Sequence, residues 1–361
     1  MSFEELKWIY EWQMVRGITQ LCQHLEGYSL RGIRKRDYPP SLFIQQPWWD
    51  EYRVFNDTVS RIGMLLAEGE VDYDVLLVHP QSSAWLHFNN EDDGNIEDLN
   101  RQFMEVINAL EQAHVLFHLG DERIMKRHGQ VKGSTLVVGQ QTYKAVIVPP
   151  VDTLSSSTVV LLKAYADNGG LLIWIGQKPA LVDGADDPAI VDLTRKGVYA
   201  VSPENALGQL PKGALDVSVT GPDGKELGAI TVARRHLSSD LVGGACRFYY
   251  FVNSDNQNTF EATLRIPAAA VWAFDPMDGS IRNISQRVEE GAVVVEHTFV
   301  PMGSLALFAA DDLKALEAEG DMTDLSDFTP LEAERFVGDW KITSVEPNAL
   351  TLDYCDFWFE R

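Results

Sequence analysis

Residues 73–80, YDVLLVHP, decide the class of fold. The central run VLLV is apolar at every position, which is typical of a parallel strand that is buried on both faces. A helical pattern follows over residues 95–113, with Asn95 as the expected N-cap and Asp98 at position N3. Its apolar stripe consists of Ile96, Leu99, Phe103, Val106, Ile107 and Leu110. A buried strand followed by an amphipathic helix predicts the first unit of an α/β domain.

The same alternation continues as far as residue 176. Strand-like runs occupy residues 114–120, 135–139, 144–150 and 171–176, and a helical pattern over residues 155–168 ends at a pair of glycines. We therefore expect a mostly parallel sheet with helices on both faces. In such a sheet a ligand sits beyond the carboxyl ends of the strands.

The flanking segments follow different patterns. Residues 3–17 predict a helix, residues 18–24 predict a short strand, and a second helix is expected to begin near Asp50. After about residue 200, alternating strands separated by the turn signals PDGK, SDNQN and PMDG predict a β-sandwich. Residues 311–339 are acidic and weakly patterned, which suggests a linker or a surface helix before strand patterns return.

Composition limits the function. The 361 residues carry a formal charge of −23, so nucleic acid and anionic membranes are not expected partners, whereas neutral ligands are. The three cysteines are far apart and have no metal-ligand spacing, and no phosphate-binding glycine loop precedes a helix. We expect no metal, no cofactor and no membrane span, and the absence of a signal-peptide pattern at the N-terminus predicts a cytoplasmic protein.

Several stretches together resemble a known family. They are KWIYEWQMVRGITQLCQHLEGYSLRGIRKRDYPPSLFIQQPWW, DVLLVHPQSSAW, YKAVIVPPVDTLSSSTVVLLKAYADNGGLLIWIG, FYYFVNS and VWAFDPMDGS. In this order they are similar to the C-terminal half of large bacterial glycoside hydrolases of the α-L-rhamnosidase type, and the resemblance covers most of residues 1–310. In that family a catalytic (β/α)8 barrel, or TIM barrel, precedes a flavodoxin-like, class I amidotransferase-like domain and β-sandwich domains.

The resemblance implies a division of the chain. Residues 1–69 would be the terminal segment of an incomplete (β/α)8 barrel, and residues 70–200 a non-catalytic amidotransferase-like domain. Residues 201–310 would form the β-sandwich, and residues 311–361 a linker and the start of a further β domain. Most of the catalytic barrel would then lie outside the chain. Because two helices and a short strand cannot bury a core unaided, we expect residues 1–69 to pack on the α/β domain.

The segment HLEGYSLRGIRKRDYPPSLFIQQPWWDEY, residues 24–52, is the densest in chemistry. If residues 18–24 resemble the last barrel strand, His24, Glu26, Tyr28 and Arg31 follow its carboxyl end, where barrel enzymes build their active sites. Glu26 and His24 are the catalytic candidates. The candidates for substrate binding are Tyr28, Arg31, Trp48 and Trp49. Alternatively, His24 is a structural group, the tryptophans fill a gap between domains, and RGIRKR is a solvated turn.

Two further loops follow strands of the predicted parallel sheet. His79 and Trp85 come after the first strand, and Asp121 and Glu122 after the second, so both loops are expected to converge at the sheet's crevice as substrate-binding candidates. The alternative is that they are surface loops. An amidotransferase-like sheet needs a cysteine nucleophile for acyl chemistry, and residues 70–200 contain none.

Two functions from different classes stay open. The chain is part of a glycoside hydrolase, rhamnosidase-like or galactosidase-like and inactive alone, or it is a non-catalytic carbohydrate-binding or scaffolding module. Hydrolysis needs two carboxyl groups, and Glu26 is the one candidate from the sequence. An apolar patch over Phe3, Trp8, Ile9 and Trp12 predicts a homo-oligomer through the N-terminal region, unless that segment folds back on its own chain.

Overall fold

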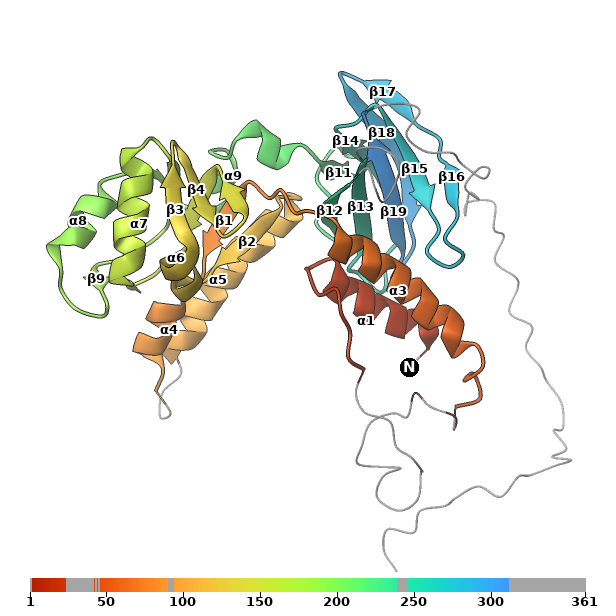
Figure 1. Ribbon diagram of the computed structural model, residues 1–361, viewed down its shortest axis with the longest axis horizontal. Helices are drawn as coiled ribbons and strands as arrows, with labels where there is room; N and C mark the ends of the chain where they lie inside the picture. The colour runs from red at the N-terminus through yellow and green to blue at the C-terminus, as the bar shows by residue number, and fades with distance from the viewer. Residues whose placement is uncertain are drawn as a thin grey trace, which may run out of the picture.

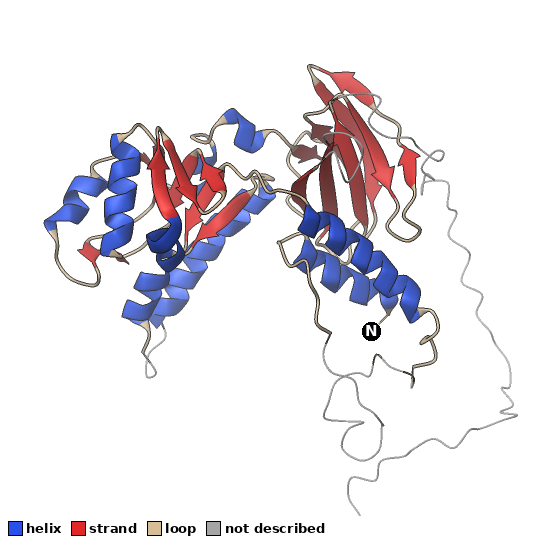
Figure 2. Ribbon diagram, in the orientation of Figure 1, coloured by secondary structure: helices blue, strands red, loops and turns tan. Residues whose placement is uncertain are grey.

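The computed structural model describes residues 2–23, 42, 44, 46–89, 94–238 and 246–311. It is a mixed α/β structure with a five-stranded parallel sheet, a small two-stranded parallel sheet and several antiparallel sheets (Figure 2). The α/β unit, which follows helix α3, and the two large antiparallel sheets lie on opposite sides of a narrow junction (Figure 1). In the described part of the chain, no helix is both long and apolar enough to cross a membrane.

The parallel sheet forms as the apolar runs predict. Its strands are β1 (Val75–Val78), β2 (Phe117–Gly120), β6 (Ala145–Val148), β8 (Leu171–Ile175) and β10 (Val198–Ala200). Among the described residues their spatial order is β10-β8-β6-β1-β2, and β1 pairs in parallel with both β2 and β6. Numbered first to fifth along the chain, the strands run in the order 2-1-3-4-5 across the sheet.

Helices cover both faces of this sheet, which explains its uninterrupted apolar runs. In β6, Val146 and Val148 pack into one core, whereas Ala145 and Ile147 pack into the other. The first core includes residues of α6 (Glu122–His128), α7 (Ser156–Asp167) and α8 (Pro188–Thr194), and the second includes residues of α5 (Gly94–Gln112) and α9 (Pro203–Leu207). The expectation of helices on both faces is confirmed.

Smaller elements surround the sheet. They are α4 (Gln81–His87), β3 (Gly129–Lys132), β4 (Thr135–Val138), β5 (Gln141–Tyr143), β7 (Thr153–Leu154), β9 (Leu181–Val182) and the 3-10 helix η1 (Lys212–Leu215). Strand β4 belongs to an antiparallel sheet with β3 and β5, not to the parallel sheet. Helix α5 begins at Gly94, so the prediction that Asn95 is its N-cap is wrong.

The later strands form two packed antiparallel sheets. One has the order β11-β14-β18-β17 and the other β12-β13-β19-β15-β16. The bounds are β11 (Ser218–Thr220), β12 (Ile230–Leu237), β13 (Cys246–Asn253), β14 (Phe260–Ile266), β15 (Ala270–Phe274), β16 (Ile281–Asn283), β17 (Arg287–Glu289), β18 (Ala292–Phe299) and β19 (Ser304–Ala310). Inner-face residues of both sheets, such as Leu264, Val295 and Leu307, share one core, as in a sandwich.

The outer face of the second sheet is covered by the two N-terminal helices, α1 (Phe3–Met14) and α3 (Tyr52–Glu68) (Figure 1). In β13, Tyr249 and Phe251 point into the sandwich core, whereas Phe248, Tyr250 and Val252 pack with the helices. The expectation that residues 1–69 pack on the α/β domain is therefore wrong. The sandwich attracts them because its outer face carries a row of large apolar side chains.

The predicted strand over residues 18–24 is not formed. Residues 18–23 carry no secondary structure, and His24 lies outside the described residues. A strand needs a neighbour to pair its backbone N–H and C=O groups, and no described strand lies in register with this segment. Helix α1 itself is well defined, since Ser2 and Glu5 form a capping box at its start.

An ionic cluster, the Arg234 clamp, holds the α/β unit to the sandwich. Arg234 Nε donates to Asp72 Oδ1 at 3.0 Å, and its Nη1 donates to both carboxylate oxygens of Asp216 at 3.1 Å. His236 Nε2 lies 2.6 Å from Asp72 Oδ2. Asp72 lies between α3 and β1, and Asp216 lies between η1 and β11. Strand β12 therefore binds the chain both where it enters the parallel sheet and where it leaves the α/β unit.

Candidate functional site

The first group of predicted site residues cannot be placed. His24, Glu26, Tyr28 and Arg31 lie outside the described residues.

The two predicted tryptophans belong to an aromatic cluster between α1 and α3. The Trp48 ring centroid lies 4.7 Å from that of Phe3 and 5.6 Å from that of Tyr52, and the Trp49 ring lies 5.8 Å from Tyr52. Both tryptophans are half-buried. This placement agrees with the packing alternative.

The second group of predicted residues follows β1 and β2, and the structure brings their loops together. Ser82 Oγ, at the start of α4, donates to Glu122 Oε1 at 2.5 Å, and the backbone N–H of Ser155 donates to Glu122 Oε2 at 2.7 Å. Glu122 is 3% exposed. Its carboxylate therefore joins the loops that follow β1, β2 and β6 at the carboxyl edge of the sheet. The predicted convergence is confirmed.

Asp121 and His79, the neighbours of this contact in the two loops, have other partners. Asp121 is the N-cap of α6, where Oδ1 accepts from the backbone N–H groups of Arg123 and Ile124. The His79 ring packs edge-on against Phe103, with centroids 5.4 Å apart. Asp121 and Glu122 thus do not act as a carboxylate pair, because one caps a helix and the other is buried.

A hollow of about 510 Å³, the Trp85 hollow, opens beside Glu122. Its lining includes Trp85, Arg123, Lys126, Ser156 and Asp183. Trp85 is 61% exposed, which is unusual for so large an apolar ring. An aromatic face beside hydroxyl, carboxylate and cationic groups suits a ligand with both apolar and hydrogen-bonding surfaces.

A smaller hollow of about 180 Å³, the His87 hollow, lies at the same edge of the sheet. His87 Nε2 is 2.6 Å from Asp152 Oδ2, and Gln177 Nε2 donates to Asp152 Oδ1 at 2.9 Å. Asn95 and Gln102 of α5 complete a polar wall. No serine, threonine or cysteine lines the described part of this hollow, so His87 and Asp152 have no nucleophile to activate there.

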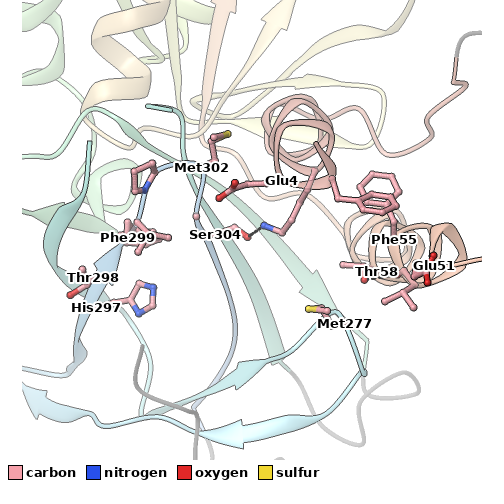
Figure 3. A pocket seen from close by; sticks show the side chains of 16 residues that line it. Glu4, Glu51, Phe55, Thr58, Met277, His297, Thr298, Phe299, Met302 and Ser304 are labelled. Atoms are coloured by element: carbon pink, nitrogen blue, oxygen red, sulfur yellow. Dashed lines mark hydrogen bonds between the residues drawn. The ribbon is translucent and has the colours of Figure 1, made fainter. Parts of the chain in front are cut away.

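An apolar cleft of about 620 Å³ lies between the helix pair and the β18–β19 turn. Figure 3 shows Phe55 and Thr58 on one side of it and Phe299 and Met302 on the other. Lys7 of α1 also lines the cleft. Its Nζ donates to Glu11 Oε2 at 2.7 Å and to Ser304 Oγ at 3.0 Å, so its charge is balanced.

Other catalytic chemistry finds little support in the described residues. They contain no cluster of three or more His, Cys, Asp or Glu side chains that could hold a metal ion. Burial raises the pKa of the Cys246 thiol to about 11, which keeps it protonated at neutral pH, and Cys246 lies in the sandwich. Two carboxylates line each of the two hollows at the sheet edge, Asp98 and Asp152 in one and Glu122 and Asp183 in the other. Glu122 and Asp152 are both held by hydrogen bonds to neighbouring side chains.

Some residues of these hollows were not predicted from the sequence. Asp152 follows β6 in the run PPVDT, and Gln177 follows β8, so the carboxyl-end rule that selected Trp85 and Glu122 could have selected them too. His87 closes a short helix that the sequence pattern did not reveal, and no signal marked it. The contacts of half-buried Ser82 and Ser155 with Glu122 depend on tertiary packing, so the sequence does not reveal them.

Known structures share this architecture. The rhamnosidase from Novosphingobium sp. PP1Y matches with a TM-score of 0.61 and 15% identity, over 90% of this chain and 31% of that chain. A catalytic mutant of Gan42B, a GH42 β-galactosidase from G. stearothermophilus, matches with a TM-score of 0.52 and 9% identity, over 78% of this chain and 48% of that chain. This chain therefore spans less than half the length of either protein.

Sequence comparison gives no family. No protein-family model matches the chain. Among curated proteins, none matches it at a significant level. At these identities the structural likeness concerns the fold alone, and it is shared with glycoside hydrolases. The chain has a glycoside-hydrolase-like fold.

Proposed function

We propose that this chain acts as the accessory part of a glycoside hydrolase of the rhamnosidase or galactosidase type and does not hydrolyse glycosides by itself. The observation that carries the proposal is the likeness to the rhamnosidase, which extends over 90% of this chain. A match over 90% of the chain is longer than any single one of the proposed domains. The reaction itself would take place in a (β/α)8 barrel.

The proposal assigns a role to each part. Helices α1 and α3 are taken as the end of the barrel, residues 70–200 as a flavodoxin-like, amidotransferase-like domain, and residues 201–310 as a β-sandwich domain. The 2-1-3-4-5 strand order supports the second assignment, since it is the order of flavodoxin-like sheets. The lack of cysteine in residues 70–200 supports a non-catalytic role for that domain.

Activity measurements test the central claim. The chain alone is incubated with the p-nitrophenyl glycosides of α-L-rhamnose and β-D-galactose, and no release of nitrophenol above the uncatalysed rate is expected. The same assay is repeated on the chain extended by the reading frame upstream of Met1. Hydrolysis by residues 1–361 alone would refute the accessory role.

Within an active extended protein, Glu26 and His24 remain the proposed catalytic residues. Replacing a general acid, base or nucleophile of a glycosidase removes most of the rate, so Glu26→Gln should lower kcat at least about 100-fold. Glu51→Gln is the matched control, because Glu51 is an exposed carboxylate that precedes α3. Equal activity of the two variants would remove Glu26 from the mechanism.

A second candidate function is carbohydrate binding at the Trp85 hollow. The exposed indole is the observation that favours it, because a flat apolar ring beside hydrogen-bonding groups is how proteins hold sugar rings. Arg123, Lys126 and Asp183 would bind hydroxyl groups. Trp48, Trp49 and His79 stay proposed contacts for a carbohydrate, whereas Asp121 and Glu122 would position the loops.

Replacement of the indole tests this second function. Isothermal titration with oligosaccharides of rhamnose and galactose should show binding that Trp85→Ala weakens about tenfold, since loss of one stacked ring removes roughly 1–2 kcal/mol. Tyr199→Ala is the control, because Tyr199 is 54% exposed on β10 and outside the hollow. Equal weakening by both variants would argue against a site at Trp85.

The predicted homo-oligomer also remains a proposal. The structure buries part of the patch that suggested it: Trp8 packs against the sandwich, and its Nε1 donates to Asn253 O at 2.9 Å. Trp12 is 44% exposed, and the Arg16 guanidinium lies 4.3 Å from its ring centroid. Light scattering behind a sizing column decides the oligomeric state, and a monomer of about 40.4 kDa would end the proposal.

A further inference from the structure

A third hollow, the junction hollow, lies where α1, the α/β unit and β12 meet, and its volume is about 490 Å³. Three parts of the chain line it. Arg16 comes from the turn after α1, Glu111 and Leu119 from the α/β unit, and Thr231 and Arg235 from β12. Ligand sites are common at such junctions, and the volume lies in their usual range.

Arg235 is a buried cation without a carboxylate partner among the described residues. The residue is 6% exposed, yet its hydrogen bonds go to neutral oxygens. Nε donates to the Leu66 carbonyl at 2.8 Å, and Nη1 donates to the Tyr73 hydroxyl at 2.9 Å and to the Arg234 carbonyl at 2.8 Å. Among the described residues, no carboxylate lies within ion-pair distance of Arg235, and Nη2 makes no hydrogen bond.

The other charged residues of the hollow do not balance this guanidinium. Arg16 and Glu111 bind each other through two bonds, from Nε at 3.0 Å and from Nη2 at 2.9 Å. Burial, with a further contribution from Arg235, lowers the pKa of His118, which therefore stays neutral at pH 7. With His114 and His118 neutral, the charges of Arg16, Glu111 and Arg235 leave the described lining with one net positive charge, in a chain whose formal charge is −23.

A buried charge without a counter-ion is costly, because neutral acceptors satisfy hydrogen bonds but do not cancel the charge. An anion in the hollow would remove this cost. We infer that the junction hollow binds the oxyanion, a carboxylate or a phosphate group, of a small organic molecule. A guanidinium edge is well suited to that group. Ile107, Phe117 and Leu119 provide an apolar wall for the rest of the ligand.

This inference does not depend on the glycosidase role. The three parts of the chain that line the hollow would all contact one ligand, so its binding should also stabilise the junction. The carboxylate of a sugar acid and the phosphate of a phosphorylated metabolite share the chemistry, and the choice of probe separates them.

Three probes test the inference by isothermal titration at constant ionic strength. D-Galacturonate presents a carboxylate, inorganic phosphate presents a phosphate, and D-galactose is the neutral counterpart of the first. We expect binding of at least one anion and none of galactose at the same concentration. Binding of galacturonate alone assigns a carboxylate ligand, and binding of phosphate alone assigns a phosphate ligand. Equal binding of galactose, or no binding of either anion, would overturn the inference.

A charge-reversal pair localises the site without disturbing the core. Leu119 lines the hollow and is 50% exposed, so either charge can be placed there. Leu119→Glu should weaken anion binding about fivefold and Leu119→Lys should strengthen it by a similar factor, as expected for one charge at short range near a surface. Val201→Glu and Val201→Lys are the controls, because Val201 is 71% exposed and outside the hollow.

Arg235→Met provides the direct test, with an expected loss of at least about tenfold in anion affinity. If that variant does not fold, the Leu119 pair still decides. Anion binding that responds equally to charge at position 119 and at position 201 would place the anion elsewhere and refute the site.

Discussion

Arg234 and Arg235 are neighbours on β12, and each is 6% exposed, but they face different surroundings. Arg234 lies between two carboxylates, Asp72 and Asp216, whereas Arg235 is held by two carbonyl oxygens and a hydroxyl. The degree of burial alone therefore does not distinguish an arginine that is paired within the fold from one that has no counter-ion in it. The partners make the distinction: a balanced charge holds the fold together, and an unbalanced one attracts an ion.

The largest effect should come from removing the balanced charge. Arg234→Met leaves Asp216 without a cation and Asp72 with His236 alone, and because both carboxylates are partly exposed the expected cost is about 2–4 kcal/mol of unfolding free energy, below that of a fully buried pair. Arg235→Met loses hydrogen bonds but also removes an uncompensated charge, so about 1–2 kcal/mol is expected. Urea unfolding of both variants gives the difference. Equal losses would erase the contrast between the two arginines.

A smaller loss should follow from crowding the backbone beside both arginines. A Cβ at Gly69, next to the end of α3, would lie 2.5 Å from Arg235 Cβ and 3.1 Å from the His236 carbonyl oxygen. Gly69→Ala should therefore cost about 1–3 kcal/mol, because β12 has to move. Gly208→Ala is the control, since its Cβ would meet nothing closer than 3.7 Å. A neutral Gly69→Ala would show that the junction is looser than described.

The parallel sheet and the sandwich were predictable because their patterns are local. Each residue of β1 is buried, and alternate residues of β13 enter different cores, so period and apolarity reveal the strands without knowledge of their partners. The place of α1 and α3 was not predictable in this way. The apolar stripe of an amphipathic helix predicts that one face is buried. It does not predict whether that face packs on a sheet of the α/β unit or on a sheet of the sandwich.

The candidate sites also differ in whether a local sequence pattern reveals them. Trp85 and Glu122 were found because they follow strands, and a parallel sheet brings such loops to one edge. The junction hollow was missed because Arg16, Glu111 and Arg235 are far apart in sequence, and nothing in ARRH distinguishes an arginine with two carboxylates from one with none. His24 and Glu26 lie outside the described residues, so their role stays a prediction.

The contrast can be sharpened by freeing a second arginine in the junction hollow. Glu111→Gln keeps the shape of the side chain but removes the charge that balances Arg16, so the lining gains one net positive charge. Galacturonate or phosphate should then bind about fivefold more tightly in the same titration. The loss of unfolding free energy should stay at or below about 1 kcal/mol, because the pair is partly exposed. An unchanged or weaker affinity would contradict the charge argument.

The smallest effect concerns the acid sensitivity of the Arg234 clamp. Burial, the largest influence on Asp72, raises its pKa, but His236 and Arg234 outweigh it, and the pKa lies below its usual value. Asp216 has no histidine partner, and burial holds its pKa above the usual value despite Arg234. Asp72 therefore contributes stability that is present above its unfolded pKa and lost as the pH falls through its folded pKa. Asp216 contributes in the opposite sense, because the folded chain takes up its proton first as the pH falls.

Two amide variants separate these contributions in melting curves recorded between pH 7 and pH 3. Asp72→Asn removes a group that weakens the fold in acid, so the melting temperature should fall less steeply with pH than in the parent chain. Asp216→Asn removes a group that favours the fold in acid, and the fall should become steeper. Both aspartates keep some contact with solvent, which limits each change to about 1 kcal/mol or less. If the melting temperatures of the two variants fell with pH at the same slope, Arg234 and His236 would not shift the pKa values of the two carboxylates in opposite directions. The proton linkage of the clamp would then have the same sign at Asp72 and at Asp216.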